Sequence, residues 1–219
     1  MGCAAVIVAS GSSRRMGFDK LAAEILGQPV LVHTVRAFMA AEAISRVIVV
    51  CPEERFQLLS GENFSKPLVR VDGGSERQES VSNGLSALLP GELLVAIHDG
   101  ARPLVRPEAI ASCIDAAREH GAATLAHAVS DTLKKADTKG FALHSVDRAG
   151  LWAMETPQIF RTDLIRRAYA VVNEKHLTVT DEVSAIEALG LPTKLIASPF
   201  PNPKITVPSD IHLATALMR

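Results

Sequence analysis

The start of the chain decides the fold, with the stretch CAAVIVASGSSRRMGFDK at residues 3–20. Its first seven residues are small and apolar, which is typical of a strand buried on both faces of a parallel sheet. Ser10 and Gly11 end this run, and no basic segment precedes it, so we expect neither a signal peptide nor a membrane-spanning helix. The stretch predicts a first, central strand that runs into a loop of small residues.

The rest of the first half alternates strand and helix patterns. Further short apolar runs occupy 46–51, 67–71, 93–98 and 122–126. Between them lie helical patterns, one with Pro29 in its first turn and another that runs from Pro107 to a stop at Gly121. This alternation predicts an α/β protein with parallel βαβ units and a Rossmann-like sheet flanked by helices.

The pattern changes at residues 131–154, where charges mix with short alternating stretches and with Gly140 and Gly150 as turn points. We interpret this segment as a β-arm that protrudes from the sheet. Helical patterns return at 162–173, 181–189 and 209–218. Without a linker or repeat, residues 1–219 are expected to form a single domain with the arm as an insertion.

Composition and net charge limit the classes of ligand that the protein could bind. The chain has 219 residues, of which 47% are hydrophobic and 4% aromatic, and 23 basic against 24 acidic residues give a net charge of −1. Such a balance argues against a nucleic-acid or membrane partner and favours a small ligand. The three cysteines lack CxxC spacing, which indicates buried free thiols and a cytoplasmic location.

The loop at residues 9–20 holds two arginines and a lysine among small residues. Small residues let backbone N–H groups approach phosphate oxygens, and Arg and Lys supply the cations that a triphosphate needs. The spacing matches neither GxGxxG nor GxxxxGK[ST], so a dinucleotide site and a P-loop lose support. The alternative is a solvated basic loop.

A second motif, residues 73–81, follows a strand and opens a helix. Ser75 with Gln78 three residues later has the pattern of a capping box, which would make the motif purely structural. The functional alternative is that Gly73 and Gly74 let a flat base lie against the backbone.

A third motif, residues 98–103, ends an apolar strand, where open α/β sheets place their ligands. Asp99 and Arg102 could hold a metal–phosphate unit or orient a hydroxyl-rich substrate, or simply pair to close the strand end. His98 is expected to be a packed histidine, since no HxH or HxxxH pattern is present.

Taken together, these motifs resemble the 2-C-methyl-D-erythritol 4-phosphate cytidylyltransferase family over almost the whole chain. The segments that carry the resemblance are 9–20, 73–81, 98–103, 131–132, 147–152, 156–158, 180–182 and 204–206. Ser10 and Gly100 depart from the family pattern, where alanine is usual at the first position and frequent at the second.

The resemblance implies a mostly parallel, mixed sheet of the nucleotidyltransferase type, with a β-arm through which two subunits form a homodimer. It implies transfer of a cytidylyl group from CTP to methylerythritol phosphate, with release of pyrophosphate, in isoprenoid precursor biosynthesis. Mg²⁺ or another divalent cation would accompany CTP, but no protein ligand for the metal is assigned. A phosphate acceptor is already an anion, so the chemistry needs fixed cations rather than a general base.

The site residues implied by the resemblance fall into three overlapping groups. The catalytic group is Arg15, Lys20, Asp99, Arg148 and Lys204. The nucleotide-binding group is Ala9, Ser10, Gly11, Gly74, Ser75, Ser80, Asp99 and Arg102. The substrate-binding group is Asp99, Arg102, Thr132, Arg148, Thr156, Thr180 and Lys204, with Thr132 and Arg148 on the arm and reaching into the partner's site.

Three alternatives stay open. Ribitol 5-phosphate cytidylyltransferases have similar motifs, although the arm and residues 147–152 favour methylerythritol phosphate. A nucleotide-binding regulator without catalysis would have little use for all five catalytic residues. A nicotinamide dehydrogenase is disfavoured because GxGxxG is missing.

Overall fold

The computed structural model describes residues 2–13 and 16–219. Its main sheet consists of β1 (Cys3–Val8), β4 (Ile44–Val50), β5 (Leu68–Val71), β6 (Leu94–Asp99), β7 (Ala122–Ala128), β10 (Trp152–Arg161) and β11 (Lys194–Ala197). Their order is β11-β7-β10-β6-β1-β4-β5. Only β10 runs antiparallel to its neighbours among these seven described strands. The predicted mostly parallel, mixed sheet with flanking helices is confirmed.

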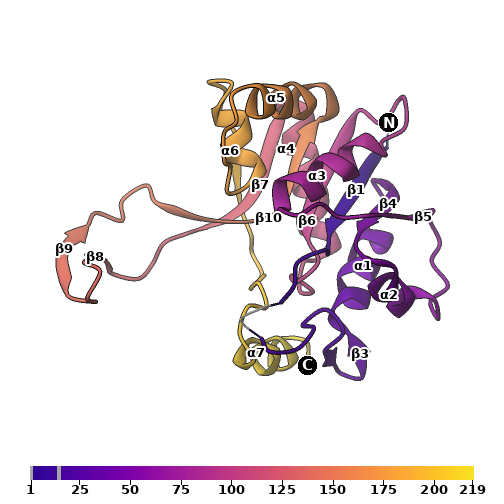
Figure 1. Ribbon diagram of the computed structural model, residues 1–219, viewed down its shortest axis with the longest axis horizontal. Coiled ribbons are helices and arrows are strands. Elements are labelled where there is room, and N and C mark those ends of the chain that lie inside the picture. The colour runs from indigo at the N-terminus through magenta and orange to yellow at the C-terminus, as the bar shows by residue number, and fades with distance from the viewer. Residues whose placement is uncertain (1, 14–15) are drawn as a thin grey trace.

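Helices cover both faces of the sheet (Figure 1). They are α1 (Val30–Ala40), the short α2 (Glu53–Phe56) with the 3₁₀ turn η1 (Gln57–Leu59), α3 (Arg77–Ser86), α4 (Pro107–His120), α5 (Thr162–Glu174), α6 (Glu182–Glu187) and α7 (Ser209–Leu217). Alternate residues of β1 point to opposite faces: Ile7 packs in the cluster that contains α1 and α4, and Val6 in the cluster with α3, α5 and α6. The first strand is therefore buried on both faces, as its sequence predicts.

Helix α4 follows the local sequence signals closely. Pro107 occupies its first turn, where a missing N–H costs no hydrogen bond, and Gly121 ends it with a left-handed φ of 85°. By contrast, the capping box predicted for Ser75 and Gln78 is wrong. Helix α3 begins at Arg77 without a side-chain cap, and Ser75 instead binds the Glu79 carboxylate.

The site is positioned by the place of β1 in the sheet. Strand β1 pairs with β4 on one side and β6 on the other, so the chain switches direction across the sheet at this point. In register, Val8 lies beside Val50 and Asp99, at the carboxyl ends of the three strands. Open α/β sheets bind their ligands at such a switch point.

The β-arm leaves the sheet after β7 and returns at β10 (Figure 1). It carries a separate two-stranded antiparallel sheet of β8 (Leu133–Ala136) and β9 (Ala142–Val146). From residue 131 to residue 151 every side chain except Leu133 is exposed. Trp152 already pairs with Ala128 of the main sheet, so the last residues of the expected arm segment, 152–154, belong to β10.

Several short elements carry no clear local pattern in the sequence. Strand β11 extends the sheet beside β7, and the small ribbon of β2 (Glu24–Ile25) and β3 (Gln28–Pro29) precedes α1. Within the described part of the chain, no helix combines the length and the apolar character needed to cross a membrane.

Candidate active site

A pocket of about 560 Å³ opens at the carboxyl ends of β1 and β6. It is lined by Val8, Ala9, Ser10, Gly11, Ser12, Ser13, Met16, Lys20, Leu21, Gly74, Ser75, Glu76, Arg77, Asp99, Gly100, Ala101, Lys204 and Thr206. All three motifs singled out in the sequence contribute to this wall, together with the segment around Lys204. Segments that are up to 198 residues apart in sequence, Val8 and Thr206, therefore share one cavity.

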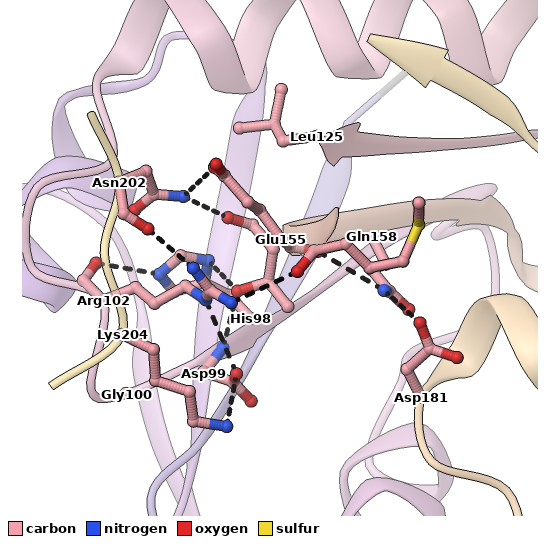
Figure 2. Close-up of polar contacts among 12 residues, drawn as sticks. His98, Asp99, Gly100, Arg102, Leu125, Glu155, Gln158, Asp181, Asn202 and Lys204 are labelled. Carbon is pink, nitrogen blue, oxygen red and sulfur yellow. Dashed lines mark hydrogen bonds and ion pairs between the residues drawn. The ribbon is translucent and has the colours of Figure 1, made fainter. Parts of the chain in front are cut away.

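Asp99 ends β6 at the floor of the pocket and is only 8% exposed. Its Oδ2 lies 2.8 Å from Lys204 Nζ and 3.7 Å from Arg102 Nε, and its Oδ1 accepts a 3.3 Å hydrogen bond from Arg77 Nε (Figure 2 shows the Lys204 contact). Burial alone would raise the pKa of Asp99, but the charges of Arg77, Lys204 and Arg102 outweigh it and hold the pKa well below its usual range. Asp99 is thus a fixed anion.

Arg77 connects Asp99 to a second, fully buried carboxylate. Its two terminal nitrogens lie 2.6 and 2.9 Å from the Glu182 carboxylate oxygens, and Tyr169 donates a 3.1 Å hydrogen bond to the same carboxylate. Burial would lower the pKa of Arg77, yet Glu182 and Asp99 raise it above its usual range. Arg77 and Glu182 lie within motifs of the sequence, but no local signal gives them a role, because their pairing spans 105 residues.

His98 and Thr156 hold Asp99 in place through a chain of hydrogen bonds, and Figure 2 shows His98 beside Asp99. The carbonyl of Arg102 can only accept, so His98 Nε2 donates to it at 3.1 Å, and Nδ1 is left to accept from the Thr156 hydroxyl at 2.9 Å. That hydroxyl accepts in turn from the Asp99 backbone N–H at 3.1 Å. Burial lowers the pKa of His98 to about 3, so the ring is neutral. The predicted packing of His98 is confirmed, and it rests on Phe38.

The segment at residues 73–81 is joined to the loop after β1 by a hydrogen bond between the hydroxyls of Ser10 and Ser80, which lie 2.7 Å apart. Ser80 Oγ also accepts from the Gly74 N–H and lies 3.1 Å from the Glu76 carbonyl. One proton arrangement satisfies every contact: Ser80 donates to Glu76, and Ser10 donates to Ser80. The Ser10 oxygen then keeps its acceptor capacity on the side of the pocket.

Gly73 and Gly74 allow close packing within the protein. A Cβ at Gly73 would lie 2.4 Å from the Ser10 Cβ, and one at Gly74 would lie 2.2 Å from the Glu79 Cβ. Glycine at these positions therefore makes room for Ser10 and Glu79 rather than for a ligand. Gly74 still contributes its backbone to the pocket wall.

The loop that follows β1 brings Lys20 to the pocket, where the Lys20 Nζ donates a hydrogen bond to the Ile205 carbonyl at 2.8 Å. Arg55, which sequence analysis missed, contacts this loop from α2: it binds the carbonyls of Ala9 and Gly11 and the carboxylate of Asp19. No local motif marks Arg55, since its partners lie 36 to 46 residues away. Arg15, predicted to act in the same loop, lies outside the described residues.

Several predicted site residues lie away from the pocket of their own chain. Thr132 and Arg148 are exposed on the β-arm, and Arg148 binds the Ser130 carbonyl there. Thr180 is exposed before α6, 3.4 Å from Ser184. Thr156 and Ser80 are buried beneath the site.

Arg102 is partly buried and donates to two backbone carbonyls, those of Asn202 at 2.6 Å and Met154 at 3.4 Å. The Asp99–Arg102 pair, which the sequence suggested as a simple closure of the strand end, is the longest of the three cationic contacts of Asp99, at 3.7 Å. Arg102 shapes the segment that carries Lys204 rather than lining the pocket itself.

The arrangement is suited to charge neutralisation rather than to nucleophilic catalysis. Lys20, Arg77 and Lys204 line a pocket to which small residues from 9–13 and Gly74 also contribute, which fits a polyphosphate with an attached neutral group. All three cysteines are buried, and burial raises the pKa of Cys3 to about 12 and that of Cys51 to about 11, so these thiols are unreactive.

Comparisons with known proteins agree with this chemistry. Residues 3–219 match the family model described as IspD, 2-C-methyl-D-erythritol 4-phosphate cytidylyltransferase. The chain is 41% identical over 223 residues to the protein of that name from Pelotomaculum thermopropionicum, which covers 99% of this chain and 94% of that protein. The chloroplastic protein of that name from rice, Oryza sativa, is 36% identical, covering 97% of this chain and 73% of that protein.

Solved structures lead to the same family. The crystal structure of 2-C-methyl-D-erythritol 4-phosphate cytidylyltransferase from Thermus thermophilus has a TM-score of 0.82 and 32% identity, and covers 99% of this chain and 98% of its own. The 4-diphosphocytidyl-2C-methyl-D-erythritol synthase of Anaerococcus prevotii has a TM-score of 0.86 and 29% identity, covering 100% and 96%. The match over nearly the whole sequence, on a fold whose motifs converge on one cation-rich pocket, places this chain in the 2-C-methyl-D-erythritol 4-phosphate cytidylyltransferase family.

Proposed function

We propose that the pocket at the end of β1 binds CTP and that the chain transfers its cytidylyl group to 2-C-methyl-D-erythritol 4-phosphate, with release of pyrophosphate. The observation that carries the proposal is the composition of the pocket lining. The lining combines the cationic side chains of Lys20, Lys204 and Arg77 with the small residues Ala9, Ser10, Gly11 and Gly74. A nucleoside triphosphate needs both, because cations bind its phosphates and small residues let its base approach the backbone.

In the reaction, a phosphate oxygen of the acceptor attacks the α-phosphorus of CTP as the bond to the β-phosphate oxygen breaks. The new P–O bond joins the cytidylyl group to the acceptor, and the electron pair of the broken bond leaves with pyrophosphate. No proton needs removal from the attacking oxygen, which matches a site whose carboxylate, Asp99, is already engaged by three cations. Lys20, Lys204 and Arg15 neutralise the charge that accumulates between the two anions.

In this proposal the cytosine contacts the small residues of the pocket lining. Few side chains at residues 9–11 and 73–75 can read a base edge, so backbone N–H and carbonyl groups select it, assisted by the Ser10 oxygen as an acceptor. Asp99, an acceptor at the floor, is placed to bind hydroxyl groups of the ribose or of the polyol.

A divalent cation enters this scheme with the nucleotide. Among residues 2–13 and 16–219 no group of three or more His, Cys, Asp or Glu side chains could hold a metal ion. The described residues therefore do not form a preformed metal site, and Asp99 is committed to Lys204 and Arg77. Triphosphate oxygens are the principal ligands expected for the cation, and we derive no catalytic step through it.

The arm residues complete the acceptor site of a homodimer in this proposal. Phe141, 70% exposed, and Leu143, 58% exposed, lie on a two-stranded ribbon that is too small to be stable alone, which supports a partner subunit as its contact. Arg148 and Thr132 would then meet methylerythritol phosphate in the partner's pocket. Thr180 stays a predicted acceptor contact within the same chain. Thr156 acts through its hydrogen bond to Asp99, and Arg102 acts through its hydrogen bond to Asn202 in the segment that carries Lys204.

Two further expectations belong to this proposal. Residues 1–219 form one domain with the arm as an insertion, since β7 and β10 on either side of the arm pair with each other in the main sheet. A cytoplasmic location is supported by the three buried, unpaired cysteines, which suit a reducing compartment.

Pyrophosphate release tests the function directly. The chain is incubated with Mg²⁺, each of the four nucleoside triphosphates, and either methylerythritol 4-phosphate or ribitol 5-phosphate. We expect release with CTP and methylerythritol phosphate alone. Equal or greater release with ribitol phosphate would move the assignment to the other acceptor, and no release with any pair would contradict the transferase.

A further inference from the structure

Arg55 lies behind the loop that carries Lys20, on the side away from the cavity. It belongs to α2, directly after the carboxyl end of β4, and its side chain is only 10% exposed. Its NH1 group binds the Ala9 carbonyl and, at 3.3 Å, the Gly11 carbonyl. Its Nε donates to Asp19 Oδ2 at 2.9 Å. One guanidinium therefore joins the beginning of the loop to its end, ten residues later.

These contacts decide which way the loop presents its backbone. In a trans peptide unit the C=O and the following N–H point in opposite directions. Because the carbonyls of Ala9 and Gly11 point at Arg55, the N–H groups of Ser10 and Ser12 point away from it. Ser10 and Ser12 line the pocket, whereas Arg55 is outside the set of described residues that do so. Arg55 thus turns these backbone donors towards the cavity, the orientation that the base requires at Ser10 and the polyphosphate requires at Ser12.

The Asp19 contact extends this control to Lys20. Asp19 Oδ1 accepts from the Leu21 N–H at 3.0 Å, and the Asp19 carbonyl accepts from the N–H groups of Ala22 and Ala23. The turn that begins at Asp19 therefore fixes the backbone on both sides of Lys20. Since Arg55 holds the Asp19 carboxylate, it also fixes where the Lys20 side chain starts.

We propose that Arg55 is a positioning residue for CTP binding: it holds residues 9–12 and 19–20 in the shape that aims the N–H groups of Ser10 and Ser12 and the side chain of Lys20 at CTP. The inference rests on the proposed function of the pocket. Arginine is required because its planar fork of donors reaches two carbonyls and a carboxylate at once, and a lysine ammonium on a flexible stem cannot fix all three.

The chain supplies a closely matched control in Arg46. Arg46 is 11% exposed, forms two hydrogen bonds of 3.0 and 2.9 Å with the Glu92 carboxylate, and donates to the Ala87 carbonyl at 2.8 Å. It lies near the start of β4, at the edge of the sheet opposite the pocket. Replacing either arginine removes a similar set of bonds, but only Arg55 acts on the loop.

The test compares Arg55→Gln, Arg55→Lys, Arg46→Gln and Arg46→Lys by steady-state kinetics and thermal unfolding. For Arg55→Gln we expect kcat/KM for CTP to fall about 30- to 100-fold and the inhibition constant of pyrophosphate to rise at least about tenfold, because a small misplacement of binding groups has effects of this size. Arg55→Lys should lose at least about tenfold. KM for methylerythritol phosphate should stay within about twofold.

The Arg46 variants should show a similar drop in melting temperature without a selective fall in kcat/KM for CTP. If the Arg55 variants keep kcat/KM for CTP within about twofold, the inference is wrong. It is also wrong if the Arg55 variants bind both substrates more weakly to the same extent, in proportion to their drop in melting temperature, and if the Arg46 variants behave in the same way. A wild-type chain without cytidylyltransferase activity would contradict the proposed function instead, so the two failures are distinct.

Discussion

Glu182, under the pocket, has no exposed surface and is held by Arg77 and Tyr169, whereas all five residues of β9 in the arm are exposed. The pocket is built from hydrogen bonds and ion pairs that join segments up to 185 residues apart. The arm holds its shape by one narrow ribbon and local turns. The comparison shows that the pocket is held by contacts within the chain, whereas the arm has little packing of its own. That a second surface holds the arm in place stays a prediction.

The largest expected effect tests whether the arm completes the pocket of a partner. Lys20→Ala and Arg148→Ala should each lower turnover about 100- to 1,000-fold, the usual result of losing one fixed charge stabiliser. Mixing the two inactive chains should recover activity. In a mixed dimer, the site on the Arg148→Ala chain keeps its own Lys20 and receives an intact Arg148 from the other arm.

Random pairing should then restore about a quarter of the wild-type activity, since half of the dimers are mixed and one of their two sites is whole. Activity is measured after the two variants are refolded together, with mixed dimers identified by differently tagged chains. Mixed dimers that form but stay inactive would show that Arg148 serves its own chain or no site.

The next effect measures how far the pocket depends on its buried charges. Glu182→Gln leaves Arg77 without its principal partner and should lower the free energy of unfolding by about 3 kcal/mol. Asp131→Asn makes the same chemical change on the exposed arm and should stay within about 0.5 kcal/mol of wild type. Urea unfolding of both variants gives the comparison. Equal losses at the two positions would refute the contrast between the regions.

A smaller effect concerns pH. His98 has a pKa of about 3 in the folded protein, against about 6.5 in an unfolded chain. The unfolded state therefore binds more protons between these values, and stability falls as the pH is lowered through that range. We expect a loss of about 2 kcal/mol between pH 7 and pH 5 from this residue.

His98→Gln should remove that part of the pH dependence, while His144→Gln, an exposed residue of the arm, should leave it in place. Both are measured by urea unfolding at pH 7 and pH 5. A pH slope that persists unchanged in His98→Gln would mean that another group causes it.

The smallest effect on folding is expected on the arm itself. Phe141→Ser should change the free energy of monomer unfolding by less than about 0.5 kcal/mol, because the side chain is 70% exposed and has little packing to lose. The dissociation constant of the dimer should rise clearly, as measured by analytical ultracentrifugation. A stable monomeric parent, or a dimer unaffected by the change, would remove the arm as the interface.

Local sequence patterns were sufficient for the main elements of the fold. The apolar run that begins at Cys3 and the stop at Gly121 report burial and backbone freedom, which depend on neighbouring residues alone. The same holds for part of the site: a loop of small residues with Lys20 and an acidic residue at a strand end, Asp99, were placed at one sheet edge by the βα alternation. Those predictions need only the periodicity and the rule that parallel strands end together.

The tertiary structure decided what these residues do. The strand β10 runs antiparallel, the serine at 75 binds Glu79 instead of completing a capping box, and Thr156 lies buried beneath Asp99. Arg55 and Arg77 became site residues only through partners at least 22 residues away. A single sequence contains no local signal for such pairs, because the energy of a hydrogen bond or ion pair depends on distance and burial, and both are set only when the sheet brings distant segments together.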